Sequence, residues 1–547
     1  MTGPRVKVLT VGAAADAVSA HVPALIADKV ASRLFAQDKT LWGPEAEEES
    51  AKRLSWVDLP KASRPLVGQI EALRSTFQEQ GLTRVVLCGM GGSSLAPEVI
   101  CETAGVPLTV LDSSQPDMVR AALQDRLEQT VVVVSSKSGS TVETDSQRRA
   151  FEQAFRDAGI DATERIVIVT DPDSPLDKDA RGAGYTVINA DPDVGGRYSA
   201  LTAFGLVPSG LAGADIGALL DEAEGVSDTF ASDDEDNPVL RLGAAMGGTS
   251  PLRDKLILID TGTQNKGFGD WAEQLIAEST GKNGKGILPV VVGSSAPTDQ
   301  TDDELYVELI SVDSERAPGG PAALAVGGSL GALMLLWEAA TAVAGRLLGI
   351  NPFDQPDVES AKAASRELLD AGTGDGDEPA FTDGSIEVRA LGGDWMGDAD
   401  SVTAAIEALL AALPGDGYLA VMAYLDRVAD QSLADVRVAF AKKLQRPVTF
   451  GWAPRFLHST GQYHKGGPSI GVYLQVTTQP REDLAVPGRE FTFGEFITSQ
   501  SGGDAKVLAD HGRPVLQLHL TDHDTGLAEL TQAISQATQS NTGSAKE

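Results

Sequence analysis

Two clusters of glycine and hydroxyl side chains follow apolar runs in the first third of the chain. The run Val85–Cys88 leads into Gly89-Met-Gly-Gly-Ser-Ser-Leu-Ala-Pro97, and Val131–Val134 leads into Ser135-Ser-Lys-Ser-Gly-Ser-Thr-Val-Glu-Thr144. Glycines after a buried strand let backbone N–H groups approach an anion, and the N-terminus of a following helix favours negative charge. Hydroxyl and ammonium groups are donors that suit a phosphate monoester. The two turns therefore predict a phosphate site.

Each turn also has a purely structural explanation. Glycines are common in tight turns, and serine or threonine at the start of a helix usually caps that helix. The second turn carries more hydroxyls than one helix end can use, and it carries Lys137 as well. We therefore favour phosphate binding over capping for the pair of turns.

Four later segments contain charged, amide or imidazole side chains, in three of them together with glycine. They are Gly195-Gly-Arg-Tyr-Ser-Ala200, Gln274-Leu-Ile-Ala-Glu-Ser-Thr-Gly-Lys-Asn-Gly-Lys285, Asn351-Pro-Phe-Asp-Gln-Pro-Asp-Val-Glu-Ser-Ala-Lys362 and Leu457-His-Ser-Thr-Gly-Gln462. Together with the two turns, these segments resemble the glucose-6-phosphate isomerases, which have the sugar-isomerase (SIS) fold. The resemblance therefore touches sites spread over most of the chain.

Matched position by position, the resemblance implies which residues bind the substrate. It assigns Gln274 and Gln355 to substrate contacts. It assigns the phosphate group to six positions: Ser93, Ser136, Lys137, Ser138, Thr141 and Thr144. The implied ligand is a small sugar phosphate.

The resemblance assigns the chemistry to four further residues. Arg197 matches the arginine that faces the reacting carbons, Glu278 matches the catalytic base, and Lys362 and His458 match the pair that acts on the ring oxygen. An aldose 6-phosphate is mostly a closed ring, so an acid must protonate the ring oxygen, and a histidine titrates near neutrality. A carboxylate can then move a proton between C2 and C1 through a cis-enediol, while a guanidinium stabilises the enediolate. We expect neither a metal nor a cofactor.

Taken one at a time, these residues have ordinary alternatives. A glutamate on an amphipathic helix usually faces solvent, Lys362 fits an exposed helix position, and Arg197 fits a structural ion pair. The segment Gly281-Lys-Asn-Gly-Lys-Gly286 follows Glu278 and is expected to place cations near an anionic ligand. The hypothesis depends on the whole set of residues.

The order of the motifs differs from the common form of the family. Here Glu278 comes first, Lys362 second and His458 last, which resembles the isomerase half of transaldolase–isomerase fusions. His464, in Gln462-Tyr-His-Lys-Gly-Gly-Pro468, is the alternative ring-opening histidine. The family's usual homodimer completes each site with a partner histidine, whereas His458 in the C-terminal third could serve its own chain.

The elements that position these motifs follow from hydrophobic patterning. Apolar runs alternate with amphipathic helices from Arg84 onward, which predicts parallel sheets covered on both faces. The predicted strands are Val85–Cys88, Leu108–Leu111, Val131–Val134, Ile166–Thr170, Thr186–Ile188, Leu256–Ile259, Ile287–Val292, Tyr306–Ile310, Ile386–Ala390, Tyr418–Tyr424, Val448–Trp452, Ile470–Thr477 and Val515–Leu520.

The expected fold class is α/β, with two SIS-type doubly wound parallel-sheet modules and a C-terminal α/β region. The predicted boundaries are 1–55 for an N-terminal helical lead-in, 56–232 and 233–371 for the two modules, 378–532 for the C-terminal region and 533–547 for a disordered tail. A Gly- and Asp-rich linker is expected over 372–379.

Composition narrows the class of protein. The formal net charge of −34 disfavours nucleic acid and anionic membranes as partners. Only Cys88 and Cys101 are present, and no secretory signal is evident, so a cytoplasmic location is expected. The uncharged segment Ala317–Trp337 is long enough to span a membrane, but its glycines and prolines favour a buried helix instead.

Two other functions remain open from the sequence. A dual glucose/mannose-6-phosphate isomerase would differ only in its contacts around C2. A non-catalytic phosphosugar-sensing SIS protein would keep the hydroxyl-rich turns but would not need Arg197, Glu278, Lys362 and His458 together. The presence of all four favours an aldose–ketose isomerase.

Overall fold

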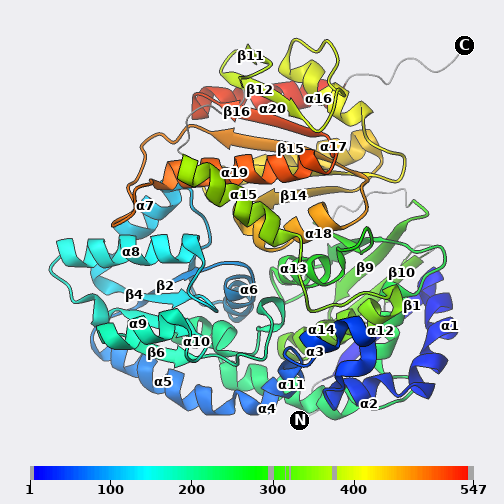
Figure 1. Ribbon diagram of the computed structural model, residues 1–547. Helices are drawn as coiled ribbons and strands as arrows, with labels where there is room; N and C mark the ends of the chain where they lie inside the picture. The colour runs from blue at the N-terminus through cyan, green and yellow to red at the C-terminus, as the bar shows by residue number, and fades with distance from the viewer. Residues whose placement is uncertain (1–4, 294–300, 315, 320–321, 372–377, 540–547) are drawn as a thin grey trace, which may run out of the picture. The chain divides into compact units, whose positions relative to one another are not determined.

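Two compact units make up the chain in the computed structural model, which describes residues 5–293, 301–314, 316–319, 322–371 and 378–539. The first unit takes in the described residues up to Asp112, those from 122 to 293, and Asp302–Gln355. The second takes in Ser113–Ala121, Thr301 and the described residues from Pro356 onward. Each unit has its own sheets and hydrophobic core (Figure 1).

The first sheet of the first unit has five parallel strands. Their order is β3 (Thr109–Leu111), β2 (Arg84–Gly89), β4 (Thr130–Ser135), β5 (Ile166–Thr170) and β6 (Thr186–Asn189). Every residue of β2, β4 and β5 is buried, as continuous Val and Ile runs predict for a sheet covered on both faces. Figure 1 shows α8 (Val142–Asp157) and α10 (Ala203–Ala212) on opposite sides of this sheet.

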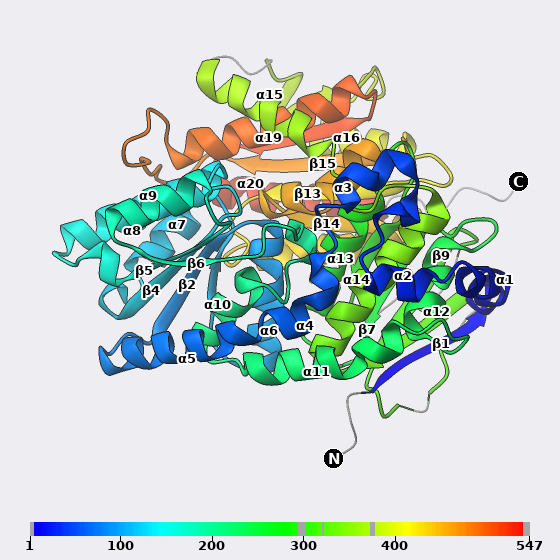
Figure 2. The ribbon, with the colours of Figure 1, turned by 60° about the horizontal axis from the view of Figure 1, so that its bottom comes forward.

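The second sheet of the first unit is parallel except at one edge. Its order is β1 (Val6–Gly12), β10 (Ala322–Gly328), β9 (Glu304–Ile310), β7 (Lys255–Asp260) and β8 (Leu288–Val292). Only β1 runs antiparallel, and it pairs with β10 along its whole length (Figure 2).

The strand β1 corrects the expectation of a purely helical start. Its sequence, VKVLTVG, alternates apolar and polar residues with the period of two that suits a half-buried edge strand. The Ala-rich helical pattern that follows obscured this alternation. Helices do occupy most of the remaining residues before the first module.

The segment Ala317–Trp337 is also corrected, because it is not one helix. Residues 322–328 form β10, and the helix α14 begins only at Leu330. A Cβ atom on Gly327 would lie 2.6 Å from the carbonyl oxygen of Ile310, so glycine lets β10 approach β9 closely. By length and composition α14 could cross a membrane, but most of it is buried within the first unit, as in a core helix.

The remaining helices of the first unit surround these two sheets. They are α1 (Ala13–Ala27), α2 (Val30–Phe35), α3 (Glu47–Ser50), α4 (Leu59–Ala62), α5 (Arg64–Glu79), α6 (Leu95–Ala104), α8 (Val142–Asp157), α9 (Pro175–Ala183), α10 (Ala203–Ala212), α11 (Ile216–Phe230), α12 (Pro238–Gly247), α13 (Phe268–Thr280) and α14 (Leu330–Leu348). A further helix, α7 (Pro116–Gln124), begins in the second unit.

The second unit contains a mixed six-stranded sheet. Its order is β11 (Phe381–Asp383), β12 (Ile386–Leu391), β16 (Val515–Leu520), β15 (Gly471–Thr478), β13 (Tyr418–Tyr424) and β14 (Val448–Trp452). The last four of these strands are parallel, while β11 and β12 are antiparallel to their neighbours. The structure thus confirms an α/β region here, and β11 is an additional short strand.

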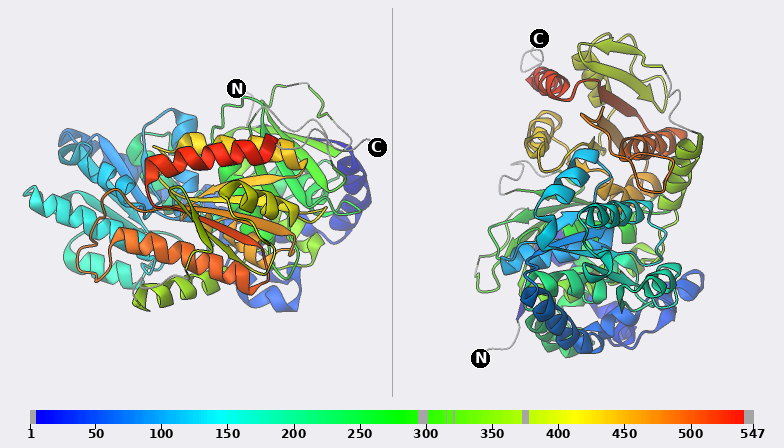
Figure 3. Two further views of the ribbon diagram at one scale, coloured as in Figure 1. Left: turned by 90° about the horizontal axis from the view of Figure 1, so that it is seen from above. Right: turned by 90° about the vertical axis from the view of Figure 1, so that its left-hand side faces the viewer.

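Helices flank this sheet on both sides. They are α15 (Val358–Ala371), α16 (Val402–Ala411), α17 (Val436–Leu444), α18 (Gly461–Gly466), α19 (Phe493–Asp510) and α20 (His523–Gln539). Figure 3 shows α19 in orange-red and α20 in red on opposite sides of the strands. The helix α15, which the sequence analysis placed in the second module, packs on α19 within the second unit.

The prediction of a disordered tail from 533 is wrong over its first part. The helix α20 continues to Gln539 and buries Ala533, Ile534 and Ala537 against the core of the second unit. These apolar residues fall at helical spacing, which explains why the Gln- and Thr-rich composition did not prevent a helix. Residues 540–547 and most of the expected linker lie outside the described residues.

Candidate active site

The two predicted phosphate turns emerge side by side from the first sheet. Gly89 at the end of β2 is paired with Ser135 at the end of β4. A Cβ atom on Gly89 would lie 3.2 Å from Cβ of Ser93 and 3.3 Å from Cβ of Ser135. The two turns are therefore in contact, and they bring Ser93 close to the hydroxyls of the second turn.

The hydroxyls of the second turn mostly bind one another. Ser136 Oγ donates to Thr141 Oγ1 at 3.3 Å and accepts from the Gly139 N–H at 3.2 Å. The hydroxyls of Ser138 and Ser140 are 2.6 Å apart. Thr141 occupies the N-cap position of α8, but its side chain does not accept a capping hydrogen bond. This arrangement favours a ligand-facing turn over simple capping, because N–H groups in the first turn of a helix lack intrahelical partners.

Thr144 lies deeper than the other predicted phosphate contacts. It is 1% exposed, and its hydroxyl has no hydrogen-bond partner among the described residues. The hydroxyl of Ser135, also buried, is in the same situation. Buried polar groups without partners are uncommon in proteins, so these two donors mark a place where a polar ligand or water is expected.

Lys137 makes an ion pair within the protein. Its Nζ lies 2.7 Å from the carboxylate of Asp171 and donates to the carbonyl of Pro192 at 3.0 Å. Burial raises the pKa of Asp171, and the hydrogen bond from Lys137 opposes that rise. Phosphate binding by Lys137 stays a prediction, and it requires the ammonium to be shared with Asp171.

Glycine packing brings Arg197 against the first turn. A Cβ atom on Gly92 would lie only 1.9 Å from the carbonyl oxygen of Gly196, so no larger residue fits there without movement. Gly196 begins the short 3-10 helix Gly196–Tyr198, which contains Arg197. The glycine-rich turn thus also positions the arginine.

Arg197 is the most extensively bonded side chain of the site. It is 3% exposed. Its Nε donates to Ser279 Oγ at 2.8 Å, Nη1 donates to Gln355 Oε1 at 2.8 Å, and Nη2 donates to the carbonyls of Pro352 and Asp354 at 2.8 and 3.0 Å. Every nitrogen of the guanidinium therefore has a protein acceptor.

Glu278 provides the carboxylate closest to this guanidinium. Its Oε1 lies 3.3 Å from Arg197 Nη1, and its Oε2 accepts from Gln274 Nε2 at 3.1 Å. Gln274 lies one turn earlier on α13, which places both side chains on one face of the helix. The Glu278 side chain remains 14% exposed, so the carboxylate is held in place and still accessible to a ligand.

The loop after α13 does not point its lysines at a ligand. Lys282 donates to the carbonyl of Asn351 at 2.8 Å and to the carboxylate of Asp354 at 2.7 Å, while Lys285 donates to the carbonyl of Leu348 at 3.2 Å. Burial, together with the nearby charge of Arg197, lowers the pKa of Lys282 to about 8. These lysines fix the segment that supplies acceptors to Arg197.

Ser279 and the carbonyls of Pro352 and Asp354 were not predicted as site groups from the sequence. Ser279 is fully buried, and besides Arg197 it contacts the hydroxyl of Tyr198 at 3.3 Å. Its position directly after Glu278 was the available signal. Every residue has a backbone carbonyl, so residue type does not reveal which carbonyls accept hydrogen bonds from Arg197, and only the structure shows them.

The two remaining predicted catalytic residues belong to the second unit. His458 ends the 3-10 helix Arg455–His458, and Lys362 lies in α15; both are half-buried. Arg197 and Glu278, by contrast, belong to the first unit. Their roles in ring opening stay predictions.

The alternative histidine, His464, is buried and contacts two tyrosine residues of the second unit. It is 2% exposed, and its Nδ1 lies 2.9 Å from the hydroxyl of Tyr418, which also contacts the hydroxyl of Tyr473 at 2.8 Å. Burial, with the charges of Lys465 and Arg513, holds the pKa of His464 well below its usual value. A neutral, buried imidazole is a poor acid at neutral pH, so the geometry favours His458.

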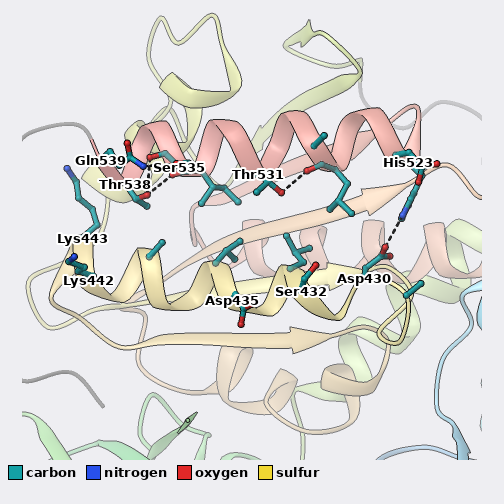
Figure 4. A pocket seen from close by; sticks show the side chains of 18 of the residues that line it. Asp430, Ser432, Asp435, Lys442, Lys443, His523, Thr531, Ser535, Thr538 and Gln539 are labelled. Carbon is teal, nitrogen blue, oxygen red and sulfur yellow. Dashed lines mark hydrogen bonds and ion pairs between the residues drawn. The ribbon is translucent and has the colours of Figure 1, made fainter. Parts of the chain in front are cut away.

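A large open pocket of about 1330 Å³ lies elsewhere, between α17 and α20 of the second unit (Figure 4). Leu433, Val436 and Leu527 contribute to its apolar walls, and Lys442 and Lys443 lie near one end. At the other end, His523 Nε2 is 3.0 Å from the carboxylate of Asp430. None of the predicted site residues lines this pocket.

Known proteins resemble the chain over part of its length. No family model matches it. A probable glucose-6-phosphate isomerase of Haloarcula marismortui is 30% identical over 347 residues, which cover 52% of this chain and 78% of the relative. A glucose-6-phosphate isomerase of Rubrobacter xylanophilus is 30% identical over 378 residues, covering 56% of this chain and 86% of the relative. The chain belongs to the glucose-6-phosphate isomerase family.

A solved structure also resembles the chain in fold. A hypothetical protein from Thermus thermophilus is 26% identical, with a TM-score of 0.56, and covers 66% of this chain and 100% of its own. Of the catalytic residues that the resemblance to this family assigned, the structure places Arg197 and Glu278 in direct contact.

Replacing Ser279 by alanine tests whether the fixed position of Arg197 matters. The change leaves a buried charged N–H group without its acceptor, which typically costs about 1.4 kcal/mol or more. We expect kcat/KM for sugar phosphate isomerisation to fall by about tenfold, measured by steady-state kinetics. Ser227→Ala, which removes a half-buried helical hydroxyl of the same unit, should leave kcat/KM nearly unchanged. Equal activity of Ser279→Ala and wild type would contradict the role of Ser279.

The His523–Asp430 pair should make stability depend on pH. The hydrogen bond that His523 donates to Asp430 raises the pKa of His523, so the pair's contribution is full below the ordinary histidine value of about 6.5 and is lost as pH rises through the raised pKa. His523→Gln should therefore lower the free energy of unfolding by about 0.5 to 1 kcal/mol more at pH 6 than at pH 9, measured in urea. His511→Gln, at an exposed position, is the control. A loss of equal size at both pH values would exclude this linkage.

Proposed function

We propose that this protein catalyses the reversible isomerisation of glucose 6-phosphate to fructose 6-phosphate. The observation that carries this proposal is the buried guanidinium of Arg197 beside the accessible carboxylate of Glu278. A base of this kind can serve two neighbouring carbons, and a fixed cation next to it can stabilise an enediolate. The family membership of the chain supports the same reaction.

Substrate binding begins at the phosphate group. The paired turns after β2 and β4 supply hydroxyls and the N-terminus of α8, which suit a phosphate dianion. Contact between Gly92 and Gly196 places this anion site next to Arg197. The sugar chain of a bound phosphate ester can then extend from the turns toward Glu278.

The isomerisation step requires one proton to move between two carbons. Glu278 removes the proton from C2 of the open-chain aldose, and the electron pair forms the C1–C2 double bond of the enediolate. Arg197 stabilises the negative charge on the sugar oxygen. Glu278 then returns the proton to C1 while the proton of the O2 hydroxyl passes to O1, which leaves the C2 carbonyl of the ketose. Gln274 and Arg197 each hold one carboxylate oxygen, so the base is oriented in advance.

Ring opening precedes this step. An acid protonates the ring oxygen while the anomeric hydroxyl loses its proton, and the C1–O5 bond breaks to give the free aldehyde. We propose His458 as the group that exchanges the proton with the ring oxygen, with Lys362 assisting. The buried setting of His464 supports this choice.

A coupled assay tests the function, and Glu278→Gln tests the base. Purified protein should convert fructose 6-phosphate into glucose 6-phosphate in the presence of EDTA, read out with glucose-6-phosphate dehydrogenase. Glu278→Gln should lower kcat by about 10³-fold while calorimetry still detects substrate binding. Glu273→Gln on the same helix should keep most activity. Full turnover by Glu278→Gln would rule out Glu278 as the base, and the same assay with mannose 6-phosphate tests the dual isomerase.

A pair of histidine variants identifies the ring-opening residue. His458→Ala should lower kcat/KM for glucose 6-phosphate by about 10²-fold, but should affect erythrose 4-phosphate much less, because phosphorylation of its O4 leaves no hydroxyl to close a ring. His464→Phe should lower thermal stability without changing the ratio between the two substrates. If only the His464 variant changed that ratio, the assignment of His458 would be wrong.

A further inference from the structure

The second unit contains a buried amide that joins two of the predicted catalytic segments. Gln462 belongs to the segment that carries His458, and it is fully buried. Its Oε1 accepts hydrogen bonds from the N–H groups of Asp357 at 3.0 Å and Val358 at 3.3 Å, and its Nε2 donates to Asp357 Oδ2 at 2.6 Å. One side chain thus satisfies both donors and an acceptor at the start of α15.

This start of α15 is where the helix that carries Lys362 is anchored. The first N–H groups of a helix have no intrahelical partner, so Gln462 acts as a cap supplied from a distant part of the sequence. The packing there is close. A Cβ atom on Gly466 would lie 2.2 Å from Asp357 Oδ2 and 2.8 Å from Gln462 Nε2, which leaves no space for a larger residue.

We infer that Gln462 is a positioning residue that holds the Lys362 helix and the His458 turn as one rigid group. The inference rests on the proposed function, in which these two residues open the sugar ring. All three hydrogen bonds of the amide are directional, and burial makes each unpaired group costly. Loss of the hydrogen bonds between Gln462 and the start of α15 would therefore let His458 and Lys362 move independently, although both side chains would still be present.

The donor and the acceptor of the side-chain hydrogen bond between Gln462 and Asp357 can be exchanged by mutation. In Gln462→Glu, a carboxylate oxygen replaces Nε2 and faces the carboxylate of Asp357, so the two repel each other. In the double variant Gln462→Glu with Asp357→Asn, the new amide of residue 357 can donate to the new carboxylate of residue 462. The side-chain hydrogen bond is then restored with donor and acceptor exchanged.

Exchange NMR on an equilibrium mixture of glucose 6-phosphate and fructose 6-phosphate measures two rates at once. Interconversion of the α and β anomers reports ring opening, and aldose–ketose interconversion reports the whole reaction. We expect Gln462→Glu to slow anomer interconversion by about tenfold or more, and by a larger factor than it lowers the concentration of folded enzyme. The double variant should recover most of that rate. Gln536→Ala, which removes an exposed hydrogen bond to Thr403 in the same unit, is the control.

The outcomes separate the inference from the function on which it rests. A wild-type enzyme without isomerase activity would overturn the proposed function and this inference together. An active wild type, with anomer interconversion in Gln462→Glu lowered no more than the concentration of folded enzyme or with no recovery in the double variant, would overturn the inference alone. If Gln462→Glu does not fold, Gln462→Met keeps the size without the charge, and a fall in anomer interconversion larger than the loss of folded enzyme is again the supporting result.

Discussion

The contacts of the buried Arg197 guanidinium hold together the parts of the first unit that form the candidate site. A buried positive charge is costly unless it is paired and hydrogen-bonded, and this one has a carboxylate, an amide oxygen, a hydroxyl and two carbonyls around it. These acceptors come from α13 and from the segment after α14, so the arginine joins elements that are far apart in the sequence. The close contact between Gly92 and Gly196 then holds the first of the two predicted phosphate turns next to Arg197.

This arrangement also explains how a strongly acidic chain can bind an anion. With a formal net charge of −34, the surface as a whole repels a phosphate ester. The lysines expected near the ligand, Lys137, Lys282 and Lys285, each bind acceptors within the protein. In the proposed site, the donors for the phosphate are therefore mainly hydroxyls, backbone N–H groups and one arginine, with Lys137 shared with Asp171, and they are effective only at short range.

Much of the fold could be predicted because buried parallel strands are continuous runs of Val, Ile and Leu. The strand β10 escaped prediction because AALAVGG has few β-branched residues, and β1 escaped because seven residues of alternation precede a strongly helical pattern. The candidate site was predictable as a set of residues, since motifs record residue types. The partners of Lys137, Lys282 and Gln462 were not, because each lies at the other end of a tertiary contact.

The antiparallel strand β1 has a consequence for how the chain is made. It is synthesised more than 300 residues before its partner β10, which follows only after most of the first unit. The first sheet can form during this interval, because all its strands lie between residues 84 and 189. The second sheet must wait, with β1 held apart or in temporary contacts, so its completion is a late step with a large loop to close. A nascent chain that stalls after residue 189 and before residue 322 would therefore carry a complete set of strands for the first sheet and an incomplete set for the second.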